Sequence, residues 1–94
     1  MKSKENLEQI LKKYKQYLRL EKSLSSNTVQ AYLNDVNKLF QYLEGKNVHP
    51  YDVTLEHLEN FSASLHDLGI QARSQARILS GIRSFYHHLV MDDY

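Results

Sequence analysis

The 94 residues are enough for one small domain with a single hydrophobic core. Three glycines and one proline leave little room for a turn-rich all-β fold, and the absence of cysteine excludes a disulfide framework and any thiolate metal site. The net charge is only +1, but residues 1–47 hold nine Lys or Arg against five Asp or Glu, giving +4, whereas residues 48–94 hold three against six, giving −3.

The first predicted element is an amphipathic helix from about Glu5 to Glu21, which follows a polar stretch, residues 1–5, that we expect to fray. Apolar residues recur along it at helical spacing and therefore predict a stripe that faces the core. The stripe consists of Leu7, Ile10, Leu11, Tyr14, Tyr17 and Leu18. Basic residues on the other sides are interpreted as a solvated face. They are Lys12, Lys13, Lys15 and Arg19.

A second helix is predicted to begin at Ser25 or Ser26, because a serine oxygen can accept hydrogen bonds from the free N–H groups of a first turn. Its apolar register runs regularly to Leu43, and Gly45 is expected to follow it as a left-handed C′ residue. The opposite face is polar and nearly uncharged. Such a face can approach a DNA groove closely and bond base edges through its amides, or it can be an ordinary hydrated surface. It consists of Asn27, Ala31, Asn34, Lys38 and Gln41.

A loop is expected over residues 46–53, where Pro50 blocks helix continuation. Thr54 is a good N-cap for a third helix, Leu55 to about Leu68, which Gly69 closes. Its predicted buried stripe consists of Leu55, Leu58, Phe61, Leu65 and Leu68. Acids near its start suit the positive end of the helix dipole but would repel phosphates, so this helix should lie away from any nucleic acid. These acids are Glu56 and Glu59.

The fourth predicted helix, Ala72–Val90, has Ser74 as either its cap or a first-turn residue. Its apolar stripe consists of Ile78, Leu79, Ile82, Phe85, Tyr86, Leu89 and Val90. The opposite face consists of Arg73, Arg77, Ser80, Ser84 and His87. No acid occurs between Asp67 and Asp92, and an acid-free stripe of this kind indicates an anionic partner. The alternative interpretation is the solvated outer face of a core helix.

These patterns predict an all-α fold of four amphipathic helices that share one core. The five histidines include no ligand pair at i, i+4 with a supporting carboxylate, so we expect no metal site. The chain also has no glycine-rich phosphate loop and no evident nucleophile–base pair, so we expect no cofactor, no small-molecule substrate and no catalysis. No apolar run is long enough for a signal peptide or a membrane helix, so we expect no membrane partner. The absence of cysteine fits a cytoplasmic protein.

Two motifs in this sequence are specific. The motif around the second helix consists of Glu21, Lys22, Ser25, Asn27, Thr28, Tyr32 and Asp35. The motif of the fourth helix consists of Ala76, Arg77, Leu79, Ser80, Arg83, Phe85 and Tyr86. Together they resemble the N-terminal SAM-like core-binding domain of tyrosine recombinases and phage-type integrases, the Xer branch in particular. Gly81 stands where this family usually has Ala, and we expect it to loosen the helix slightly.

The resemblance implies a compact four-helix orthogonal bundle that forms half of a clamp on duplex DNA during DNA integration and recombination. Residues 1–94 would be one core-binding domain without enzyme activity, and residues 91–94 would begin the linker to an absent catalytic domain. The implied partners are double-stranded DNA, that C-terminal catalytic domain and other recombinase protomers on DNA. By match, the DNA-contact candidates are Asn27, Thr28, Arg77, Ser80 and Arg83. Helical projection adds Ala31, Asn34, Lys38 and Arg73.

Helical projection also makes predictions about individual side chains. It places Arg83 on the flank of the fourth helix, where a pairing with Asp35 competes with a DNA contact. Tyr32 projects into the core, and Arg77 projects away from it, so replacing Arg77 should leave stability nearly unchanged. The alternative function is a small helical protein–protein interaction module with no DNA role. Duplex affinity that falls steeply with salt would distinguish DNA binding from that alternative.

Overall fold

The computed structural model describes residues 6–91 of the chain. This part forms α1 (Leu7–Gln16) with a π-helical turn η1 (Tyr17–Glu21), then α2 (Ser26–Gly45), a 3-10 turn η2 (Pro50–Asp52), α3 (Leu55–Asp67) and α4 (Ala72–Met91). The predicted all-α fold with four α-helices is therefore confirmed for the described residues. The stretch expected to fray, residues 1–5, and residues 92–94 of the expected linker lie outside the described residues.

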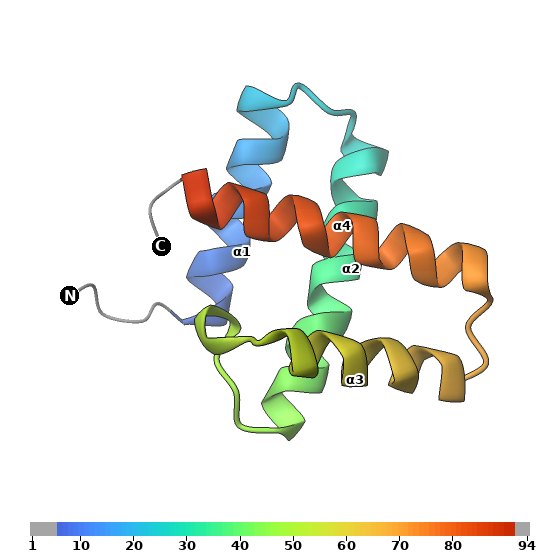
Figure 1. Ribbon diagram of the computed structural model, residues 1–94. Coiled ribbons are helices and arrows are strands. Elements are labelled where there is room, and N and C mark those ends of the chain that lie inside the picture. Colours follow the sequence, from blue (N-terminus) through green and yellow to red (C-terminus); the bar gives the residue numbers. More distant parts are fainter. Residues whose placement is uncertain (1–5, 92–94) are drawn as a thin grey trace.

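The helices form two crossed layers. Figure 1 shows α1 and α2 running antiparallel in one layer, while α3 and α4 lie across them and run antiparallel to each other. The molecule is accordingly a slab of 34 × 34 × 18 Å, and its most extensive helix–helix contact is between α2 and α4. This arrangement is the orthogonal bundle that the family resemblance implies. It leaves one face of every helix exposed to solvent.

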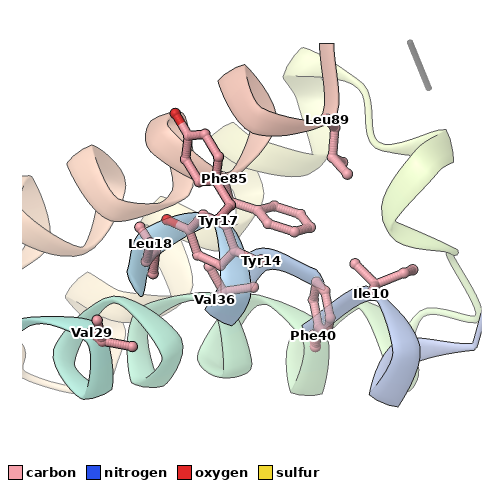
Figure 2. Close-up of a cluster of buried hydrophobic side chains, with 9 residues drawn as sticks. All are labelled: Ile10, Tyr14, Tyr17, Leu18, Val29, Val36, Phe40, Phe85 and Leu89. Atoms are coloured by element: carbon pink, nitrogen blue, oxygen red, sulfur yellow. The ribbon is translucent and has the colours of Figure 1, made fainter. Parts of the chain in front are cut away.

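Two hydrophobic clusters fill the space between the layers. The first joins α1, η1, α2 and α4, and its residues are Ile10, Tyr14, Tyr17, Leu18, Val29, Val36, Phe40, Phe85 and Leu89 (Figure 2). Phe85 lies at its centre, with ring centroids 5.2 Å from Tyr14 and 5.5 Å from Phe40. The second cluster joins α2, α3 and α4, and consists of Leu39, Leu43, Phe61, Leu65, Ile78 and Ile82. Because α2 and α4 contribute to both clusters, packing on both sides of their crossing fixes their relative position.

Local side-chain bonds set where the helices begin. Asn6 accepts a hydrogen bond from the Gln9 N–H at 2.8 Å, so α1 begins at Leu7, two residues later than predicted. The Ser25 hydroxyl accepts from the Thr28 N–H at 3.3 Å, which decides between the two serines proposed as the cap of α2. The predicted cap of α3, Thr54, is confirmed.

Several predictions about helix ends and stripe ends are wrong. Gly45 is the last residue of α2 and not its left-handed terminator, because Asn47, with φ of 58°, makes the left-handed turn instead. Gly69 does have this conformation, with φ of 85°. Leu55, Leu68 and Val90 are 72%, 77% and 72% exposed, although periodicity assigned them to buried stripes. Each lies at the end of a helix, where the opposing layer no longer covers the stripe.

Candidate nucleic-acid interface

The crossing of α2 and α4 places a carboxylate inside the protein. Asp35 of α2 is fully buried and faces Gly81 of α4. A Cβ atom on Gly81 would lie 2.6 Å from the Asp35 Oδ2 atom, which is closer than such contacts occur in proteins. Gly81 was expected only to loosen α4. In the structure, its missing side chain lets the α4 backbone approach this carboxylate.

Arg77 is the cation that meets Asp35. Its Nη1 donates a hydrogen bond to Asp35 Oδ2 at 3.0 Å, while 55% of the Arg77 side chain remains exposed. The predicted pairing of Asp35 with Arg83 is therefore wrong. Arg77 is exposed, as its projection away from the core stripe predicts, but it also reaches the buried carboxylate. The reason is the position of the crossing: Arg77 is one helical turn before Gly81 and on the same side of α4, whereas Arg83 faces α3.

Electrostatic effects of opposite sign act on this carboxylate. Burial raises the pKa of Asp35 above its ordinary value, and the charge and hydrogen bond of Arg77, together with the charge of Lys38, oppose the increase without overcoming it. Lys38 is exposed on α2 within electrostatic reach of the same group. Asp35 Oδ1 has no hydrogen-bond partner among the described residues. The crossing thus presents two cations at the surface above one buried anion.

The remaining α2 candidates follow the projected stripe. Asn27 and Thr28 are exposed in the first turn of α2, and the Thr28 hydroxyl oxygen accepts a hydrogen bond from the Ser25 hydroxyl at 3.0 Å. Asn34 is also exposed, and its Oδ1 accepts from the Gln30 side chain at 3.0 Å. Ala31 is half-buried. The predicted face of α2 is therefore accessible, with its small residue recessed.

The α4 stripe is shorter than predicted. Arg73, Ser80 and His87 are exposed as projected, but Ser84 turns inward and accepts a hydrogen bond from the Tyr14 hydroxyl at 3.1 Å. Tyr14 is fully buried, and this burial raises its pKa to about 12. Ser84 therefore satisfies a buried hydroxyl of α1 and is not part of an exposed stripe.

Arg83 is exposed but lies apart from the crossing. It lines a groove of about 650 Å³ between α3 and α4, together with Glu59 of α3 and His87 of α4. The rest of this groove is mainly apolar and includes Leu55 and Val90. Arg83 therefore shares its surroundings with an acid. The structure brings Lys38 and Arg77 together and separates Arg83 from them.

The sequence interpretation missed the pairing of Asp35 with Arg77 and the reason for a glycine at position 81. The available signal was Gly81 itself, since a glycine inside a regular helix often marks a close backbone approach. Within residues 6–91, the structure contains no group of three or more His, Asp or Glu side chains that could hold a metal ion. No helix in the same part is both long and apolar enough to cross a bilayer.

Comparison with known proteins gives a consistent set of matches. Residues 11–92 match the family model described as phage integrase, N-terminal SAM-like domain. The chain is 37% identical over 84 residues to a tyrosine recombinase XerC of Pseudomonas syringae pv. tomato, covering 88% of this chain and 28% of that protein. It is 35% identical over 89 residues to a tyrosine recombinase XerD of Staphylococcus saprophyticus, covering 94% and 30%. The chain thus spans less than a third of the length of these relatives. No solved structure matches it significantly.

Proposed function

The chain belongs to the phage integrase N-terminal SAM-like domain family, and we propose that it is the DNA-binding domain of a site-specific tyrosine recombinase. In this role it forms half of a clamp on duplex DNA during DNA integration and recombination. The observation that carries the proposal is the α2–α4 crossing, where Lys38 and Arg77 converge from different helices on one edge of the surface.

The exposed groups beside this crossing suit the two kinds of contact that a duplex offers. Lys38 and Arg73 are exposed cations that can neutralise phosphates and fix the position of the domain. Asn34 carries an amide, and Arg77 a guanidinium, of the types that bond base edges in the major groove. In the first turn of α2 the Thr28 N–H is bonded to the Ser25 hydroxyl, so the N–H groups left to favour a phosphate are those of Ser26 and Asn27.

The proposal assigns binding and not chemistry to this chain. The relatives are named tyrosine recombinases, and the chain spans only 28–30% of their length. We infer that strand cleavage and rejoining belong to a catalytic domain of the parent protein, which acts in the cytoplasm together with other protomers on the same DNA. The chain alone would bind a duplex and leave it intact.

A second candidate function is a helical protein-interaction module. The mainly apolar groove between α3 and α4 favours it, since Leu55 and Val90 expose large apolar side chains there. A protein partner held in such a groove depends on apolar contact, and its affinity does not follow phosphate neutralisation. The two functions therefore differ in their response to salt.

The test measures fluorescence anisotropy of a labelled random-sequence duplex with the 94-residue chain over a range of salt concentrations. About three to five phosphate contacts predict micromolar or weaker affinity near physiological salt and a linear fall of log affinity with log salt. Lys38→Ala should make this slope shallower by about one unit. Lys46→Ala is the matched control, because it removes the same charge at the C-cap of α2, beyond the crossing.

Two outcomes would contradict DNA binding at this face. One is equal weakening by Lys38→Ala and Lys46→Ala, which would reduce binding to general charge attraction. The other is equal affinity for heparin, a polyanion without duplex geometry.

A further inference from the structure

We propose that Asp35 is a positioning residue for DNA binding: its carboxylate holds one edge of the Arg77 guanidinium so that the other edge faces the duplex. This inference rests on the proposed function, because it assigns a role within the same surface. It adds a residue that no duplex can reach, since Asp35 is fully buried beneath α4.

The contact divides the guanidinium into a held part and a free part. Arginine has five N–H donors in a rigid planar fork, and Asp35 Oδ2 accepts from Nη1 at 3.0 Å. More than half of the Arg77 side chain stays exposed, so donors remain for a phosphate or a guanine edge. A free surface arginine loses rotamer entropy when it binds, and an arginine that is already held loses less.

The Asp35 carboxylate is itself held in place by the fold. The α4 backbone at Gly81 comes so close to Asp35 that even a methyl group would not fit between them. The neighbouring α2 residues Val36 and Leu39 are completely buried, one in each hydrophobic cluster. The carboxylate therefore cannot follow Arg77 if the arginine swings outward. This distinguishes the pair from a surface salt bridge between two flexible side chains.

Stability does not account for the charge on Asp35. Burial raises the pKa of this carboxyl even though Arg77 and Lys38 both favour its ionised form, so the fold as a whole disfavours the charge. One of its oxygens, Oδ1, has no hydrogen-bond partner among residues 6–91. Because the charge on Asp35 works against stability, a role in fixing the geometry of Arg77 would explain it.

Neutralisation of Arg77 by Asp35 would affect DNA binding in the opposite direction from positioning. Asp35 also neutralises part of the Arg77 charge, and if that were its only effect, removing it would make Arg77 a better phosphate ligand. Positioning predicts the reverse, namely that Arg77 contributes less once Asp35 has lost its charge. The two roles are therefore distinguished by whether the contribution of Arg77 rises or falls in an Asp35→Asn background.

The experiment is a double-mutant cycle on binding of the labelled random-sequence duplex, with Arg77→Lys as the second substitution. Lysine keeps the charge that compensates Asp35, so the variant should stay folded, but its ammonium cannot hold a carboxylate and present a fork at once. We expect Arg77→Lys to weaken binding in the parent chain by a factor at least about three larger than in Asp35→Asn. Circular dichroism verifies folding of all four proteins.

A second measurement keeps the proposal testable without DNA. The ¹⁵N heteronuclear NOE of the Arg77 Nε–H group should indicate an ordered side chain in the parent and a mobile one in Asp35→Asn. Arg83, which is exposed and does not meet Asp35, is the internal reference and should not change.

The possible failures are separable. An Arg77→Lys effect that is equal or larger in the Asp35→Asn background would overturn positioning, as would an unchanged NOE at Arg77. If Lys38→Ala still makes the salt slope shallower in that case, the proposed function stands and only the role of Asp35 is wrong. If neither Lys38 nor Arg77 affects duplex binding, both proposals fail.

Discussion

At the scale of single residues, Asp35 determines an expected pH dependence of stability. The charged groups that act on its pKa are Arg77 on α4 and Lys38 on α2. Burial dominates, so the pKa of Asp35 in the folded chain lies above its ordinary value of 3.8. The folded state therefore holds this proton more tightly than the unfolded state, and the resulting stability is lost as pH rises through the folded pKa.

Asp35→Asn should consequently raise the thermal midpoint at pH 7. The gain should shrink as pH falls and vanish below the ordinary aspartate pKa, where the parent carboxyl is also neutral. Thermal unfolding followed by circular dichroism between pH 3 and pH 7 would measure the difference between the two chains. A variant that is less stable than the parent at pH 7, with the deficit growing as pH rises, would mean that the Arg77 ion pair outweighs burial.

Arg77 leads to a prediction opposite to the one from its helical projection. Arg77→Ala removes the one hydrogen bond that the buried Asp35 carboxylate makes within residues 6–91, so we expect a loss of about 1–3 kcal/mol in unfolding free energy. Arg83→Ala is the matched control, because Arg83 is exposed and should change stability by less than about 0.5 kcal/mol. Urea denaturation at pH 7 measures both. Equal values for the two variants would show that the Asp35 contact contributes nothing.

At the scale of the elements, two adjacent serines at the beginning of α2 have different roles. Ser25 is the N-cap and accepts from the Thr28 N–H at 3.3 Å, whereas Ser26 is the first helical residue. Ser25→Ala should therefore cost about 0.5–2 kcal/mol, and Ser26→Ala should cost almost nothing. Urea denaturation of the pair is a close comparison, since both variants lose one exposed hydroxyl. The reverse order would move the start of α2 by one residue and shift the face that carries Asn27 and Asn34.

At the scale of the whole molecule, the two hydrophobic clusters share α2 and α4 and should unfold together. Phe85→Ala in the first cluster and Phe61→Ala in the second should each cost about 3–5 kcal/mol, because both rings are almost fully buried. Exposed Asn34→Ala should cost almost nothing. Far-UV circular dichroism and tyrosine fluorescence should report one coincident transition for every variant. Separate transitions would mean that the clusters are independent folding units.

The sequence by itself determined the helices and most of their boundaries. Apolar spacing, the caps Ser25 and Thr54 and the left-handed Gly69 act over a few residues, so each can be recognised without knowing the fold. The same reasoning found the accessible face of α2, because the outer side of a regular helix follows directly from its apolar stripe. Errors at this level lie at helix ends, as with the exposed Leu55 and Leu68.

Only the tertiary structure decided which side chains meet. Arg77 and Arg83 both project from α4 beside its apolar stripe. Because α2 crosses α4 near Gly81, Asp35 forms its hydrogen bond with Arg77 and not with Arg83. Ser84 likewise turns inward because the Tyr14 hydroxyl arrives from α1. These contacts join residues 42 and 70 positions apart in the chain, so no local pattern records them. Periodicity defines the faces of a helix, but the partner of each face depends on how the layers cross.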